Sequence, residues 1–235
     1  MRTMLLACVL SLWPVAPGSA GPGEDGSRAF KRGDYAMALW LWRPLAKEGD
    51  TTAQYLIGHM YDRGLGVPHD YTIAAEWFRK AAEQGDASAQ HDLGVMCFLG
   101  QGVPQDYVKA VSWYRRAAEQ GLAEARYKLG MMYDKGWGVP QDDALAVEWY
   151  SKAAEQGDAS AQFKLGVRYA KGEGVPQDDA VAHKWLNLAA SRYPASSAKW
   201  REKAIKLREA SATRMTPAQI AEAQRMAREW KPKKK

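Results

Sequence analysis

Proline recurs along this chain at a fixed interval of 36 residues, and that interval restricts the fold more than any other feature. The four prolines are Pro68, Pro104, Pro140 and Pro176. The same interval relates four glycines, Gly58, Gly94, Gly130 and Gly166, and four tryptophans, Trp77, Trp113, Trp149 and Trp185. Because different residue types repeat in one register, a whole structural unit is repeated. The sequence therefore predicts an array of stacked repeats.

Each unit contains two stretches with helical periodicity. In the second unit, the apolar residues of the first stretch are Ala89, Leu93, Met96 and Cys97, and those of the second include Ala110, Val111, Tyr114, Ala117 and Ala118. Spacings of three and four residues indicate α-helices. We therefore expect two helices per unit, with paired alanines that allow close helix packing and tryptophans that fill the space between units.

A turn motif separates the two helices of each unit. Gly-x-Gly-Val-Pro-x-Asp occurs at 64–70, 100–106, 136–142 and 172–178. Glycine permits the positive φ at which helices end, and proline disfavours helix in the residue before it. The aspartate can accept hydrogen bonds from the first free amides of the next helix. Asp86 and Asp158, which follow second helices, are expected to cap first helices in the same way.

These residues resemble the Sel1-like repeat, a relative of the tetratricopeptide repeat. The resemblance covers about Asp50 to Ala190 in four copies, at about 50–85, 86–121, 122–157 and 158–191. It implies an all-α fold, an α-solenoid in which helix-turn-helix units form a right-handed superhelix. The chain departs from the pattern at Cys97, which replaces a tyrosine, and at Leu122, which replaces a capping aspartate.

The amino-terminal residues 1–20 have the pattern of a secretory signal peptide. Arg2 precedes an apolar run, Met4–Leu12, and Gly18-Ser19-Ala20 provides a small-residue cleavage site. A lipoprotein signal ending at Cys8 is the alternative. The apolar run is too short to span a bilayer, so we expect a periplasmic or secreted bacterial protein with no integral membrane segment in the mature chain. Residues 21–49 align with the second helix of a unit and are expected to form a half-repeat cap.

The carboxy-terminal residues 192–235 lose the repeat and are strongly basic. They contain 13 Lys and Arg against 4 Asp and Glu. Two helices are expected there, at about Ser196–Ala210 and Pro217–Trp230. The charge fits either a solvated helix face with a frayed tail, Lys231–Lys235, or a surface with weak attraction to anions. Nucleic acid is not expected as a partner of an exported protein.

Motifs for chemistry are weak in this sequence. Gly21–Gly26 matches a dinucleotide fingerprint but follows no strand, and Ser196-x-x-Lys199 is expected once by chance. We call an equivalent position in successive repeats a slot. The four histidines occupy different slots, and their spacing is not that of a metal site. Cys97 is expected to be a buried apolar side chain rather than a reactive thiol. We therefore expect no cofactor, no metal and no enzymatic activity.

The resemblance implies that the first helices of the units line a concave face. Side chains in their non-core slots are the predicted partner-binding residues: Thr52, Tyr55, His59, His91, Val95, Phe98, Tyr127, Met131, Phe163 and Val167. One row, formed by Tyr55, His91, Tyr127 and Phe163, repeats rings at unit spacing, as peptide-binding hot spots do. The alternative is that these rings pack against the adjacent unit.

The function expected from these patterns is that of a non-catalytic exported scaffold or adaptor. As a monomer, it would bind a protein or peptide partner on the concave face, in envelope signalling or assembly. Two alternatives remain open at this point. One is a hydrolase acting on cell-wall or β-lactam substrates, and the other is a protein that binds anionic glycan, lipid or a host surface through its basic carboxy-terminal cap.

Overall fold

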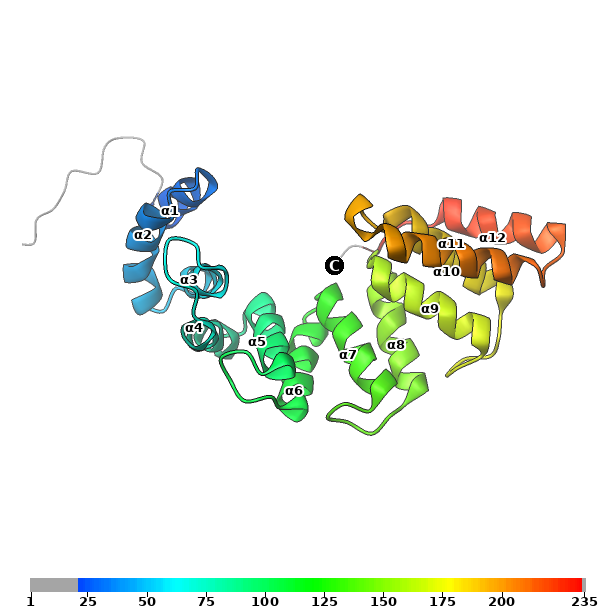
Figure 1. Cartoon of the computed structure of the whole chain (residues 1–235), viewed down its shortest axis with the longest axis horizontal. Helices are drawn as coiled ribbons and strands as arrows, with labels where there is room; N and C mark the ends of the chain where they lie inside the picture. The colour runs from blue at the N-terminus through cyan, green and yellow to red at the C-terminus, as the bar shows by residue number, and fades with distance from the viewer. Residues whose placement is uncertain (1–20, 234–235) are drawn as a thin grey trace, which may run out of the picture.

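The structure, a computed structural model, describes residues 21–233, which form twelve α-helices, one short 3₁₀ helix and no strand. The units follow one another along an arc from α1 at one end to the α10–α12 group at the other (Figure 1). This architecture confirms the predicted α-solenoid. The helices are α1 Pro22–Lys31, α2 Tyr35–Lys47, α3 Thr51–Arg63, α4 Tyr71–Glu83, α5 Ala87–Leu99, α6 Tyr107–Glu119, α7 Ala123–Lys135, α8 Asp143–Ala154, α9 Ala159–Lys171, α10 Asp179–Arg192, η1 Ala195–Ser197, α11 Ala198–Ala212 and α12 Pro217–Glu229.

The helix ends follow the turn motif. Asp106 accepts a hydrogen bond from the backbone N–H of Lys109 at 2.9 Å, and Asp86 accepts one from Ala89 at 2.6 Å. The first helix α5 ends at Gly100, whose φ is 72°. Leu122 gives α7 no side-chain cap, as the sequence indicates. The predicted capping scheme is therefore confirmed.

Within a unit, the repeated glycine of the first helix lies against a ring of the second. A Cβ at Gly94 would lie 2.8 Å from the ring of Tyr114, which is fully buried. Phe78 and Tyr150 stand in the same slot against Gly58 and Gly130. The glycine therefore sets how closely the two helices of a unit approach.

Between units, the tryptophans and a buried glutamine make the contacts. Trp113 is partly buried and packs against the cores of its own and the preceding unit, as predicted. Gln90 is buried and donates from Nε2 to the carbonyl of Ala82 at 3.0 Å, at the end of the preceding second helix. Gln54 and Gln162 repeat this contact with Ala46 and Ala154. A buried carbonyl at the end of each of these second helices thus accepts an additional hydrogen bond from the next unit.

The amino-terminal cap is larger than the expected half-repeat, because α1 and α2 form a complete helix pair. Gly26 faces Trp42 as Gly94 faces Tyr114. The short turn at Gly33 and Asp34 replaces the longer Gly-x-Gly-Val-Pro-x-Asp motif. The shorter turn moves α1 out of the 36-residue register, which is why the sequence pattern does not reveal it.

At the carboxy-terminal end, α11 and α12 both pack on α10 (Figure 1). The predicted capping box at Thr216 and Gln219 opens α12. Beyond α12, the tail is docked at its described end rather than frayed. The backbone N–H of Lys233 donates to the carbonyl of Glu155 at 2.8 Å, and its Nζ lies 2.9 Å from the Glu155 carboxylate.

The predicted signal peptide, residues 1–20, lies outside the described residues. No helix within residues 21–233 has the length and apolar character that crossing a bilayer requires. Cys97 is buried, as expected, and burial raises the pKa of its thiol.

Candidate functional site

The predicted partner-binding residues lie on the four first helices, α3, α5, α7 and α9. We call the surface that these helices form the first-helix face. Because the repeat places equivalent slots on equivalent helix positions, side chains from successive units lie side by side along this face. Two polar clusters, one at each half of the array, join neighbouring units there.

The aromatic row does not project freely from the first-helix face. The ring centroids of Tyr55 and Phe78 are 5.7 Å apart, and those of Tyr127 and Tyr150 are 5.8 Å apart. His91 lies 5.8 Å from Tyr114 in the same way. Each of these three row residues is half-buried and packs on the core ring of its own unit. Tyr55 and Tyr127 also pack against the core of the following unit, so the two interpretations of the row are not exclusive. Each remains partly exposed to solvent.

Phe163, the fourth member of the row, is a correction to the prediction. Its side chain is only 5% exposed, because α11 covers it. The rings of Tyr193 and Trp200 lie 6.5 and 5.6 Å from that of Phe163, edge to face. Phe163 therefore belongs to the core of the carboxy-terminal cap and is not accessible to a partner.

The first polar cluster joins the first and second units through Asp92, a residue of α5. Its two carboxylate oxygens lie 3.3 Å from His59 Nε2 and 2.9 Å from His91 Nδ1. The His59 ring also stands edge-on to Tyr55 at 4.6 Å. Burial opposes ionisation of Asp92, but the hydrogen bonds from the two histidines outweigh it and lower its pKa to about 2. Asp92 thus holds three predicted site residues in one arrangement.

Those contacts also fix the protons of the two imidazoles. A neutral imidazole carries one N–H, so donation to Asp92 places it on Nε2 of His59 and Nδ1 of His91. Within residues 21–233, the opposite nitrogens, His59 Nδ1 and His91 Nε2, are buried without a hydrogen-bond partner. The cluster is therefore an internal tie between two units.

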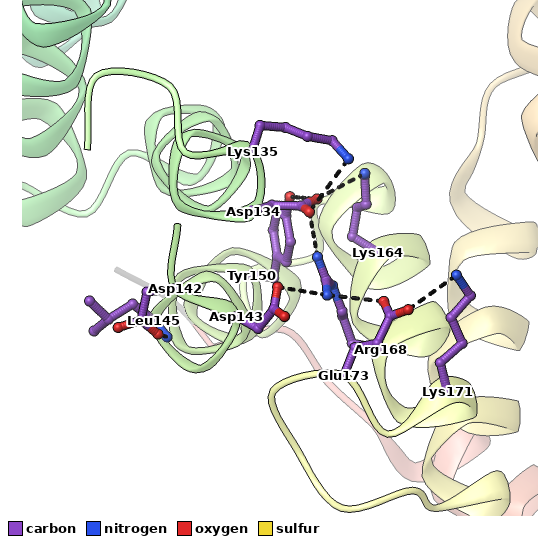
Figure 2. Close-up of polar contacts among 10 residues, drawn as sticks. All are labelled: Asp134, Lys135, Asp142, Asp143, Leu145, Tyr150, Lys164, Arg168, Lys171 and Glu173. Atoms are coloured by element: carbon purple, nitrogen blue, oxygen red, sulfur yellow. Dashed lines mark hydrogen bonds and ion pairs between the residues drawn. The ribbon is translucent and has the colours of Figure 1, made fainter. Parts of the chain in front are cut away.

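The second polar cluster joins the third and fourth units through Asp134 (Figure 2). Asp134 is 5% exposed and accepts hydrogen bonds from Tyr150 Oη at 3.0 Å, from Lys164 Nζ at 3.3 Å and from the Arg168 guanidinium. Burial would raise the pKa of Asp134, but Lys164 and Arg168 reverse this effect and lower it. The carboxylate is therefore ionised at neutral pH.

Arg168 extends this cluster towards solvent. Its Nη1 lies 2.9 Å from Asp143 and 3.0 Å from Glu173 (Figure 2). The equivalent slot in the other units holds Met60, Met96 and Met132, all buried. A pocket of 390 Å³ opens beside these charges, lined by residues that include Lys135, Val167 and Lys171. Arg168 therefore places a cation in a buried slot that is apolar in the other units, beside a pocket lined mostly by charged residues.

The remaining predicted residues differ in exposure and in the side chains that they contact. Thr52 is exposed at the rim of a 480 Å³ pocket that Leu56 and Trp42 also line. Val95, Met131 and Val167 are half-buried on the first-helix face. Phe98 instead packs in an aromatic cluster with Tyr107 and Trp137, at 5.3 Å from each.

Asp92, Lys164 and Arg168 are not among the site residues predicted from the sequence. Arg168 carries a signal in the sequence, because a cation replaces methionine in a repeated core slot. Asp92 and Lys164 share one slot with Leu56 and Lys128, which shows no such pattern. Within residues 21–233, no group of three or more His, Cys, Asp or Glu side chains is arranged to hold a metal ion.

Known proteins with similar sequences and structures share this architecture. The model of the Sel1 repeat family matches residues 51–86, 87–122, 123–158 and 159–193. A protective antigen of uropathogenic Escherichia coli, whose structure displays the SLR fold, is 32% identical with a TM-score of 0.78, over 89% of this chain and 44% of its own. This chain thus spans less than half the length of that protein.

A Sel1 repeat protein from Oxalobacter formigenes is 29% identical with a TM-score of 0.70, over 89% of this chain and 100% of its own. A Sel1 repeat protein from Klebsiella pneumoniae, at 22% identity and a TM-score of 0.51, shares the fold. No curated protein matches the chain. Repeats of this family generally form non-catalytic helical scaffolds for protein–protein interaction.

Proposed function

The chain belongs to the Sel1 repeat family, and from this premise we propose that it is a non-catalytic scaffold that binds a protein or peptide on its first-helix face. The observation that carries the proposal is the pair of polar clusters centred on Asp92 and Asp134. Each cluster ties two successive first helices together with side chains from both. A face held in this way is ordered before binding, so less conformational entropy is lost on association.

The binding surface that we propose is narrower than the sequence suggests. It comprises the partly exposed side chains of Tyr55, His91 and Tyr127, with Thr52, His59, Val95 and Met131 around them. Phe163 is excluded because α11 covers it, and Phe98 because it belongs to another cluster. Tyrosine side chains beside charged groups suit an extended peptide, because they offer apolar contact and hydrogen bonding together.

The cellular setting is also part of the proposal. The signal pattern in residues 1–20 supports export to the periplasm or beyond in a bacterium, and similar solved structures come from bacteria. We place the protein there as a monomeric adaptor in envelope signalling or assembly. Fractionation of cells that express the full chain tests this placement, since recovery of an unprocessed protein from the cytoplasm would contradict it.

The binding proposal is tested by affinity capture from a periplasmic extract with a matched pair of variants. The double variant Tyr55→Ala, Tyr127→Ala truncates two half-buried rings of the first-helix face. The control, Tyr71→Ala with Tyr107→Ala, truncates two half-buried tyrosines at the starts of second helices. We expect partner recovery to fall at least tenfold for the first variant and to stay unchanged for the control. Circular dichroism checks the fold, and equal recovery by both variants would refute the proposal.

A second candidate function rests on α11. Trp200 is 48% exposed and lies next to Lys199 and Arg201 in the sequence, and Lys203 Nζ lies 5.2 Å from its ring. An exposed aromatic ring among cations is typical of attachment to anionic interfaces. Sedimentation with anionic vesicles at low and high salt tests it. Binding that Trp200→Ala and Lys203→Ala leave unchanged would contradict this role.

A further inference from the structure

The outward face of α2 carries apolar residues in slots that the other second helices fill with polar ones. Trp40 is 69% exposed, the largest exposed fraction of any bulky apolar side chain in residues 21–233. Its slot holds Glu76, Ser112, Glu148 and Lys184 in the following units. Pro44 is also exposed, and its slot holds Lys80, Arg116 and Lys152 in the next three units. An apolar surface that departs from the polar pattern of its own repeat indicates a contact.

These residues form a groove between α2 and the turn motif of the next unit. The groove has a volume of 520 Å³ and is lined by Ala36, Leu39, Trp40, Arg43, Pro44, Lys47 and Gly66. Its only charged residues are Arg43 and Lys47, and neither has an ion-pair partner within the described chain. The groove is thus apolar along its floor and positive at its rim.

The opposite end of the array shows what such a face accepts. Leu188 of α10 occupies the slot of Pro44, and Trp185 occupies the slot of Leu41. Both are buried, at 5% and 7% exposure, because Ala227 of α12 and Trp230 just beyond it pack against them. Figure 1 shows α12 beside α10 and no helix in the corresponding place on α2. Within residues 21–233, an amphipathic helix therefore covers an apolar second-helix face at the α10 end, and none covers that of α2.

We propose that the α2 groove docks an amphipathic helix of a partner protein, with an apolar stripe on Trp40 and Pro44 and acidic residues that pair with Arg43 and Lys47. The surface is separate from the first-helix face. A second copy of the chain fits less well, since α2 packed on α2 would bring four cations together without acidic groups from the groove. An acidic helix supplies the missing charge.

The test selects binders from a displayed library of helical peptides against the full chain. We expect enriched peptides to carry apolar residues at helical spacing flanked by Asp or Glu. Their affinity should fall at least tenfold in Trp40→Glu, Pro44→Lys, which restores residues that the repeat itself uses in these slots. The control Val108→Thr alters an apolar residue that is 66% exposed on α6 and should leave affinity unchanged.

Three outcomes would overturn the proposal. They are the absence of enriched acidic helices, enriched peptides that bind the double variant as well as the wild type, and self-association in sedimentation velocity that the double variant abolishes. The last would assign the groove to a second copy. Because the variants lie outside the first-helix face, Tyr55→Ala, Tyr127→Ala should bind the selected peptides normally, which separates this test from that of the proposed function.

Discussion

Arg168 of α9 donates to the buried carboxylate of Asp134 on α7, in a slot where the other three first helices carry methionine. The pair joins the third and fourth units, and both side chains are almost fully buried. Breaking a buried ion pair leaves one charge in a medium that solvates it poorly, whereas replacing both partners with apolar groups does not. The two kinds of change should therefore have different effects on stability.

Arg168→Met restores the residue of the other units but leaves Asp134 without its guanidinium partner. We expect it to lower the free energy of unfolding by about 3 kcal/mol, the lower end of the usual cost, because Tyr150 and Lys164 remain bonded to Asp134. Arg168→Met with Asp134→Ala leaves no buried charge and should be more stable than Arg168→Met alone, although the buried Tyr150 hydroxyl loses its acceptor. Urea unfolding of the single and double variants measures both values. If Arg168→Met left the free energy of unfolding unchanged, the ion pair would not stabilise the fold.

Gly94→Ala should destabilise the chain even though alanine is the better helix former. The added methyl would lie 2.8 Å from the Tyr114 ring, inside a packed core. Overpacking of this kind costs about 1–3 kcal/mol. Gly23→Ala is the matched control, because its Cβ would meet only Leu45 at 3.8 Å. Thermal unfolding should show a lower midpoint for the first variant and an unchanged or slightly higher one for the second.

Acid should weaken the tie at Asp92 within a defined pH range. Its pKa is lowered to about 2 in the folded chain, from about 3.9 for an unfolded aspartate. A depressed carboxyl pKa stabilises the fold above the unfolded value, and this stabilisation is lost as pH falls through the folded value. We expect the free energy of unfolding of the wild type to exceed that of Asp92→Asn by about 1–2 kcal/mol at pH 6 and by much less near pH 2. A difference that does not depend on pH would contradict the assignment.

Trp230 should stabilise the carboxy-terminal end of the array, where it packs against α10. Its ring lies 6.2 Å from that of Trp185, edge to face, and Arg192 stacks on it at 4.4 Å. Trp230→Ala uncovers part of Trp185 and should cost about 1–3 kcal/mol, less than a fully buried tryptophan would. Lys233→Ala removes only an exposed ion pair and should cost about 1 kcal/mol or less. Hydrogen exchange should then rise in α10 and α12 for Trp230→Ala alone.

The fold could be predicted from the sequence because its physical causes repeat every 36 residues. Gly94 recurs since each unit needs a close helix contact, and Asp106 recurs since each second helix needs a cap. The pattern does not predict α1, because the turn between α1 and α2 is shorter than the repeated turn motif. The period therefore reveals the units that share one turn and misses a unit that does not.

The site could be predicted only in part. Tyr55 and Tyr127 lie on the predicted face, but the burial of Phe163 depends on α11, whose sequence has left the repeat. The tie between Asp134 and Arg168 joins side chains from different slots, so neither slot alone reveals the pairing. Contacts between residues that do not follow the repeat can be identified only when the positions of those residues in three dimensions are known.

Site-specific photocrosslinking in living bacteria tests partner binding on the first-helix face most directly. A photoreactive amino acid at Thr52 or Glu124, exposed residues that share one slot on α3 and α7, places the probe on that face. The same probe at Val108 places it on a second helix. If a partner binds this face, the probes at Thr52 and at Glu124 should each crosslink the same protein or peptide, and the probe at Val108 should crosslink none. An adduct from Val108 alone, or none from Thr52 and Glu124, would contradict it.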